Sequence, residues 1–185
     1  MKRVISMASL ALLTGISLLG AAAAGAHGKN RPEIYRAWLT GFEEVAWPST
    51  ALPGGIAAVS SPAHGFLRAV VDEDEGTIQY WLTFDGFVNT VAQSHFHFGQ
   101  HHTQGGISVF LCTNLGNGPA GTQACPQSGQ ITGTIHSTDV IGPAGQGIAA
   151  GEFAELVAAI RAGVVYVNIH TNVFPAGEIR GQLGR

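Results

Sequence analysis

The sequence is poor in charge and lacks several functional signatures. Only 11% of its 185 residues are charged, with a formal net charge of −3. No basic stripe is present, which excludes the electrostatic footprint of nucleic-acid binding, so we predict no nucleic-acid partner. Beyond the first 26 residues, no apolar run is long enough to span a bilayer. The chain also has no Gly-x-Ser-x-Gly elbow and no phosphate-binding loop, so no catalytic residue is predicted.

Cysteine is equally scarce, with Cys112 and Cys125 as the only two. The segment between them is rich in Gly, Asn, Pro and Thr, as in a loop. An even count in an exported chain predicts a disulfide, which would stabilise the fold by roughly 3 kcal/mol. The alternative is a pair of thiolate metal ligands.

Export itself is predicted from the first 26 residues, which have the pattern of a signal peptide. Lys2 and Arg3 form a positive start, residues 4–20 are apolar, and Ala24-Gly25-Ala26 fits a small-x-small cleavage site. The apolar run is short and ends in alanines, which favours a cleaved signal over a membrane anchor.

The mature chain should therefore begin near His27 and be secreted or periplasmic. We expect residues 27–33 to form a flexible tail and residues 34–185 to form one domain. As the first mature residue, His27 could chelate copper through its amine and imidazole. The alternative is that His27 simply belongs to the mobile tail.

An all-β fold is predicted from the 26 glycines and from short segments in which apolar and polar residues alternate. Since strands and helices do not alternate, a parallel doubly wound sheet is unfavourable. We predict an antiparallel Greek-key β-sandwich or barrel, superoxide-dismutase-like or immunoglobulin-like, with one short helix over residues 152–162. The expected strands are residues 34–44, 56–59, 65–71, 77–84, 91–98, 107–112, 130–136, 164–170 and 178–183.

The strongest candidate site is the strand that contains His95 and His97. Alternate residues of a strand share a face, so both imidazoles point one way while Phe96 and Phe98 point toward the core. On the strand predicted at residues 164–170, His170 faces away from the apolar valines and isoleucine. If the two strands are neighbours, three imidazoles converge.

Three histidines suit copper or zinc and leave one coordination position open. His101 and His102 follow the first strand in a polar loop, and either could supply a fourth ligand. The alternatives are that the three strand histidines only brace the fold and that the loop pair is solvated. Glu178 and Arg180 share a face of the last strand and could form a cross-strand polar network with Asn168 or with Glu43 and Glu44. A structural salt bridge is the favoured interpretation, and a catalytic acid is the alternative.

Three ordered motifs resemble the CHRD domain, first described in chordin. They are Leu39-Thr40-Gly41-Phe42-Glu43-Glu44-Val45, Ser94-His95-Phe96-His97, and the late segments 162–171 and 174–182. The resemblance covers residues 34–183 and implies an extracellular or periplasmic all-β domain. It implies little about activity, since the growth-factor-binding modules that accompany the domain in chordin are missing from this sequence.

A second, more local resemblance concerns chemistry. The His95-Phe96-His97 strand followed by Gly99 is similar to the copper-binding strand of copper/zinc superoxide dismutases, and His170 is similar to that family's late strand histidine. No bridging histidine or zinc-binding aspartate series follows. We therefore carry forward a metal-binding exported domain, with two alternatives: a non-enzymatic surface interaction module with an unknown protein partner, and a copper-dependent dismutase-like enzyme.

Overall fold

The structure is a computed structural model that describes residues 31–45 and 58–185. The predicted signal peptide and His27 lie outside these residues, as does the first half of the strand expected at 56–59; its described half, residues 58–59, is not in a strand. No helix in the described ranges is long and apolar enough to cross a membrane.

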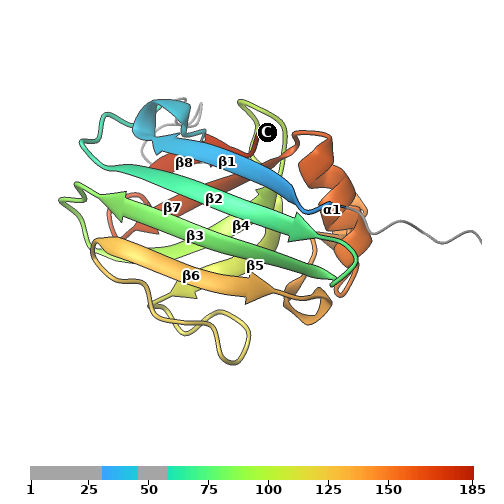
Figure 1. Cartoon of the computed structure of the whole chain (residues 1–185). Coiled ribbons are helices and arrows are strands. Elements are labelled where there is room, and N and C mark those ends of the chain that lie inside the picture. The colour runs from blue at the N-terminus through green and yellow to red at the C-terminus, as the bar shows by residue number, and fades with distance from the viewer. Residues whose placement is uncertain (1–30, 46–57) are drawn as a thin grey trace, which may run out of the picture.

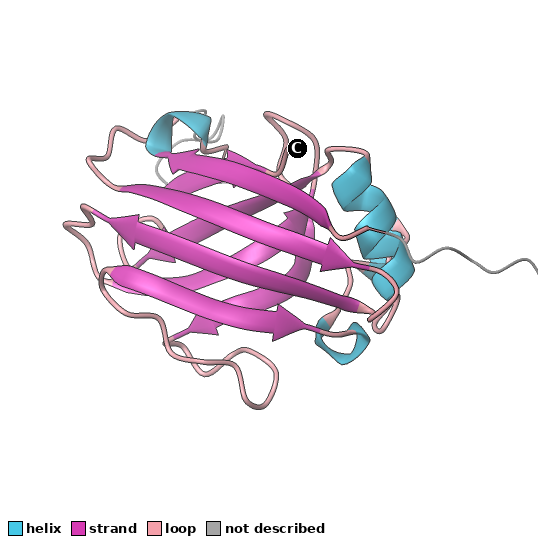
Figure 2. Ribbon diagram, in the orientation of Figure 1, coloured by secondary structure: helices cyan, strands magenta, loops and turns pink. Residues whose placement is uncertain are grey.

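Eight antiparallel strands form a single sheet that curls into a nearly closed barrel (Figures 1 and 2). The all-β antiparallel prediction is therefore confirmed, in its barrel form. The order across the sheet is β5-β4-β7-β8-β1-β2-β3-β6. The strands are β1 (Glu33–Thr40), β2 (His64–Asp72), β3 (Thr77–Asp85), β4 (Val91–Phe98), β5 (Gly106–Thr113), β6 (Gly129–Ile135), β7 (Val165–Thr171) and β8 (Ile179–Gln182).

The core fills the inside of this curled sheet. Alternation along each strand directs one set of side chains inward, so that Leu39, Leu67 and Leu82 from neighbouring strands are all fully buried. Phe96 of β4 meets them from the opposite wall, with its ring 6.5 Å from that of Tyr80. The phenylalanine at position 96 therefore anchors the histidine strand in the core.

The barrel has a seam where its two edge strands, β5 and β6, face each other. These strands are the two ends of the sheet order and do not pair as neighbours. The side-chain amide of Gln123 spans the seam, since Nε2 donates to Leu111 O on β5 and to Thr132 O on β6, at 3.1 Å each. It also donates to the Tyr80 hydroxyl at 2.8 Å. A single side chain thus links the two edges.

One helix, α1 (Phe153–Arg161), covers one end of the barrel, where the sequence predicted it (Figure 1). Leu156, Val157 and Ile160 are buried against the core. Arg161 at the end of the helix donates to Glu33 of β1 at 2.8 Å and to Glu73 in the β2–β3 turn at 2.7 Å. These ion pairs tie the helix to the sheet.

The first strand is shorter than predicted. It ends at Thr40, and a 3₁₀ turn, η1 (Gly41–Glu43), follows. The backbone of Val59 packs so closely that a Cβ at position 41 would lie 2.2 Å from Val59 O, and Val59 N donates to Gly41 O. This contact is possible because glycine has no side chain. Two further short 3₁₀ turns are η2 (Ser137–Asp139) and η3 (Ala144–Gln146).

Every residue of β7 is buried, on both faces of the strand. Val165, Val167 and Ile169 point into the barrel core, as predicted. Tyr166, Asn168 and His170 point outward but are covered. A second, polar layer therefore lies outside the sheet at β4, β7 and β8, and the candidate site is in this layer.

Candidate metal centre

The register between β4 and β7 brings the three predicted histidines to the same outer face. His97 is paired with Tyr166, His95 with Asn168, and Gln93 with His170. His170 is therefore opposite the residue two positions before His95, so His170 and His95 are diagonal neighbours on the same face of the strand pair. Ser94 and Phe96, the alternate residues of β4, point to the other side and are fully buried.

The three imidazoles converge in a buried cluster. His95 Nδ1 lies 3.1 Å from His170 Nε2, and the ring centres of His95 and His97 are 5.4 Å apart. One nitrogen from each of the three rings lies within 4.8 Å of the other two. None of the rings is more than 6% exposed.

The hydrogen bonds fix which nitrogen of each ring carries its proton. His97 Nδ1 lies 2.9 Å from Gly105 O, and His170 Nδ1 lies 3.0 Å from Pro175 O. A carbonyl oxygen only accepts, so both Nδ1 atoms carry protons and both Nε2 atoms present lone pairs. His170 Nε2 then accepts from His95 Nδ1.

Two ring nitrogens are left with lone pairs and nothing to bind. His95 Nε2 and His97 Nε2 are buried and have no hydrogen-bond partner among the described residues. The carboxamide oxygen of Asn168, the residue paired with His95 on β7, is also buried without a hydrogen-bond partner among the described residues. Buried polar atoms are rarely left unpaired, so this cluster has the chemical character of a site built for a ligand.

Burial also keeps the cluster neutral. Loss of hydration lowers the pKa of His95 to about 2, of His97 to about 3 and of His170 to about 4. For His95, the neighbouring rings of His170 and His97 lower it further because like charges repel. At neutral pH all three imidazoles are therefore unprotonated at one nitrogen, which is the form that binds metals.

The loop from Gly99 to Gly105 forms a roof over the cluster. Besides the His97 contact, Gly105 N donates to the Tyr166 hydroxyl at 3.1 Å. Arg180 of β8 donates to Gln100 O and Thr103 O, at 2.8 and 2.7 Å. Residues from β4, β7 and β8 thus hold the loop in place through its backbone.

Tyr166 lies at the centre of a stack beneath this roof. Its ring is parallel to that of His97, with centres 4.9 Å apart, and the Arg180 guanidinium carbon lies 3.4 Å from the ring centre. Because β7 runs between β4 and β8, the two groups reach Tyr166 from opposite sides. The stack fixes the orientation of His97.

The favoured interpretation of Glu178 and Arg180, a structural salt bridge, is wrong. Arg180 contacts carbonyls and an aromatic ring, whereas Glu178 accepts hydrogen bonds from Ser61, Asn89 and Thr171. No ion pair involves either residue among the described ranges. Glu178 directly precedes β8, which contains Arg180, and the two side chains stabilise different loops.

His101 and His102 lie outside the cluster. Both are exposed in the turn that follows Gln100, and their rings are 5.9 Å from each other. The structure therefore gives neither of them the place of a fourth ligand. His64 and His136 are also exposed, on other parts of the surface.

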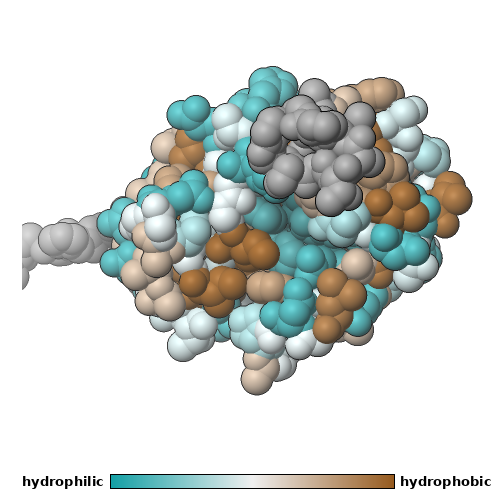
Figure 3. Space-filling model, turned by 180° about the vertical axis from the view of Figure 1, so that it is seen from behind, coloured by the Kyte–Doolittle hydropathy of each residue, from teal (hydrophilic) through white to brown (hydrophobic). Residues whose placement is uncertain are grey.

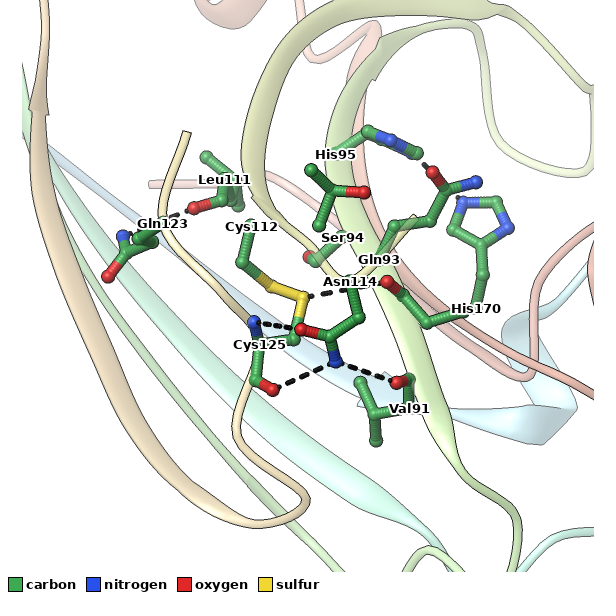
Figure 4. Close-up of a disulfide and its surroundings, with 12 residues drawn as sticks. Val91, Gln93, Ser94, His95, Leu111, Cys112, Asn114, Gln123, Cys125 and His170 are labelled. Carbon is green, nitrogen blue, oxygen red and sulfur yellow. Dashed lines mark hydrogen bonds between the residues drawn. A yellow bond between two sulfur atoms is a disulfide. The ribbon is translucent and has the colours of Figure 1, made fainter. Parts of the chain in front are cut away.

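The predicted disulfide is confirmed and lies behind the histidine strand. Cys112 and Cys125 are bonded, with Cα atoms 5.1 Å apart. Asn114 stabilises this loop by donating to Val91 O and Cys125 O and accepting from Cys125 N (Figure 4). The loop between the two cysteines adjoins a cavity of about 310 Å³. This cavity is lined by His170, Gln93, Leu115 and Pro175, among others. Of the three clustered histidines, only His170 lines this cavity.

Several residues of the site were not found from the sequence. Tyr166 and Asn168 were placed on the correct face of their strand, but Tyr166 was given no role and Asn168 only that of a polar partner for Glu178 and Arg180. Gly105 and Pro175 contribute only carbonyl oxygens, and a backbone acceptor leaves no trace in residue type. The pairing register could have revealed Tyr166, because it sets this aromatic ring directly opposite His97.

Comparison with known families agrees with the motifs. The family model for the CHRD domain matches residues 35–183, which is most of the chain. The protein therefore belongs to the CHRD-domain family. No curated protein and no solved structure gave a significant match.

Proposed function

We propose that this CHRD-domain protein is exported and binds copper or zinc through His95, His97 and His170. The observation that carries the proposal is the set of buried nitrogen lone pairs that converge from two strands. Export is supported by the signal-peptide pattern at residues 1–26 and by the disulfide, which is typical of oxidising compartments.

The hydrogen bonds around the cluster support a metal site. Metal-binding histidines usually donate their second ring N–H to a carbonyl or carboxylate, which fixes the ring. His97 and His170 both do so. Nitrogens bound at about 2.0–2.1 Å to one tetrahedral ion stand roughly 3.3 Å apart, and His95 Nδ1 and His170 Nε2 are 3.1 Å apart. For both to be ligands, the His95 proton must move from Nδ1 to Nε2.

The donor set favours copper or zinc over other ions. Three imidazoles supply only nitrogen, and imidazole suits these metals. Both cysteines are in the disulfide and so offer no thiolate. A bound ion would supply an electrophilic centre or, for copper, a redox centre. The surrounding residues orient the rings and limit the access of water. The task we propose is metal holding or buffering.

The test uses protein recovered from the exported fraction and purified without a histidine tag. We expect about one equivalent of copper or zinc per chain. After a chelator has removed this metal, titration with the same ion should restore one equivalent per chain. His97→Ala and His97→Gln should weaken binding by at least about tenfold and abolish the rise in melting temperature that metal gives the wild type.

The matched control is the double variant His101→Ala/His102→Ala, which removes two exposed histidines near the same strand. It should bind as the wild type does. Equal binding by the His97 variants and the wild type would contradict the site and favour histidines that only brace the fold. An intact Met1 on the recovered protein would contradict cleavage of residues 1–26.

A further inference from the structure

The outward face of β1, β2 and β3 carries an unusual group of side chains. Arg36, Trp38, Phe66, Arg68 and Trp81 alternate with core residues and point away from the barrel; we call them the aromatic–arginine face. Two of the chain's three tryptophans are here. These strands form the front wall in Figure 1, while β4 and β7 of the histidine cluster lie behind.

The aromatic part of this face is open to solvent. The Trp38 side chain is 74% exposed, although its ring centre lies only 4.5 Å from that of Phe66. Beside the pair is a shallow hollow of about 170 Å³, lined also by Thr40, His64, Thr83 and Asp85. On the opposite side of the molecule, the apolar residues form separate groups among polar ones (Figure 3). An exposed aromatic pair with polar groups at its rim is typical of a binding surface.

Among the residues that the structure describes, the two arginines of the face have no acidic partner. Arg36 and Arg68 are directly opposite on paired strands, an arrangement in which like charges repel. Neither guanidinium has an ion pair or a side-chain hydrogen bond within the described part of the chain. The Arg68 guanidinium carbon lies 4.8 Å from the ring centre of Trp81, which holds the charge in place. An anionic ligand would relieve the repulsion.

We propose that the aromatic–arginine face binds an acidic polysaccharide, a sugar chain that carries carboxylates. The flat face of a pyranose presents C–H groups that pack on aromatic rings such as Trp38 and Phe66. Guanidinium groups bind carboxylates with two parallel hydrogen bonds. Adjacent strands are about 4.8 Å apart and alternate residues about 7 Å apart, so rings and charges are spaced for successive sugar units.

The charge of the molecule favours this ligand over a nucleic acid. Binding to a phosphate backbone draws on many cationic contacts, whereas this face offers two arginines on a chain of net charge −3. Asp72 and Asp85 stand at the ends of β2 and β3 on the same side and would repel a densely charged polymer. A sparsely charged polysaccharide fits two isolated cations.

The proposal is tested with the full exported protein and, as the probe, a polygalacturonate in which most carboxylates are methyl-esterified, so that the remaining charges are widely spaced. Affinity electrophoresis or calorimetry should show binding that weakens with salt. Trp38→Ala and Arg68→Gln should each weaken it about tenfold. Arg31→Gln removes an equal charge from an exposed position outside the face and should leave binding unchanged, as should Val88→Ala, which truncates an exposed apolar residue elsewhere.

Neutral glucan and single-stranded DNA of similar length serve as competing ligands. Weaker binding to the glucan, lost in Trp38→Ala but retained in Arg68→Gln, supports the division of roles. No binding to the partly esterified polygalacturonate, or equal binding by Trp38→Ala, overturns the proposal. Stronger binding to DNA than to the polysaccharide also overturns the proposal. So does a protein that shows no affinity for polysaccharide but forms a dimer that the Trp38→Ala substitution dissociates. The histidine site is not involved, so its test is independent.

Discussion

Buried histidines make the stability of the metal-free protein depend on pH. The pKa values of His95, His97 and His170 are lowered in the folded state to between about 2 and 4, whereas unfolded histidine titrates near 6.5. Between these values the unfolded chain binds more protons than the folded one. The folded state therefore has its full stability above about pH 6.5 and loses it as the pH falls.

We expect the melting temperature of chelator-treated protein to drop steadily from about pH 6.5 to pH 5. Each buried histidine contributes at most about 1.4 kcal/mol per pH unit to the slope. His97→Gln should reduce the slope by roughly one third, whereas His101→Gln, at an exposed position, should leave it unchanged. A melting temperature that stays constant between pH 7 and pH 5 would show that these rings accept protons in the folded state.

At the scale of elements, ion pairs join α1 to the sheet. Glu33 accepts from Arg161 and Arg185, and Arg161 also reaches Glu73. The Arg161 guanidinium and then the Tyr35 hydroxyl, as hydrogen-bond donors, lower the pKa of Glu33 to about 2. A depressed carboxyl pKa contributes stability above its unfolded value of about 4.3, and this contribution is lost as the pH falls toward 2.

Glu33→Gln should lower the free energy of unfolding at pH 7 by less than about 1 kcal/mol, because the pair is near the surface. The difference from the wild type should shrink in high salt and disappear near pH 2, as measured by chemical denaturation. Glu75→Gln, in the exposed turn after β2, is the control for loss of one negative charge. A Glu33→Gln deficit that persists at pH 2 would point to packing instead of charge.

Strands and helix were predictable because their signals are local. β4 has the bounds that its residue pattern indicated, and α1 follows the spacing of Phe153, Leu156, Val157 and Ile160. The end of β1 was missed because it depends on contact with Val59, which is distant in sequence. Arg180 was misassigned because its partners lie in a loop some 80 residues earlier. The convergence of the three histidines could be predicted because alternate residues of a strand share a face. The covering loop from Gly99 to Gly105 could not be predicted in this way.

At the scale of the whole molecule, the barrel depends on the seam between β5 and β6. Gln123 Nε2 contacts carbonyls on both edges. Gln123→Ala should lower the free energy of unfolding by about 0.5–1.5 kcal/mol, because it removes the hydrogen bonds by which one side chain joins the two edges. Gln130→Ala, which removes an exposed glutamine from β6, should cost less than 0.5 kcal/mol. Equal losses for the two variants, measured by denaturant unfolding, would argue that the seam is held by other contacts.

The same seam also affects how readily the protein aggregates at high concentration. An open sheet edge is a template on which another chain can add a strand and begin a fibril. Here the two edges face each other, with Gln123 and its loop across the gap, so each edge shields the other. The nearly closed barrel therefore gives the domain resistance to ordered aggregation, provided that the Gln123 contacts across the seam are kept.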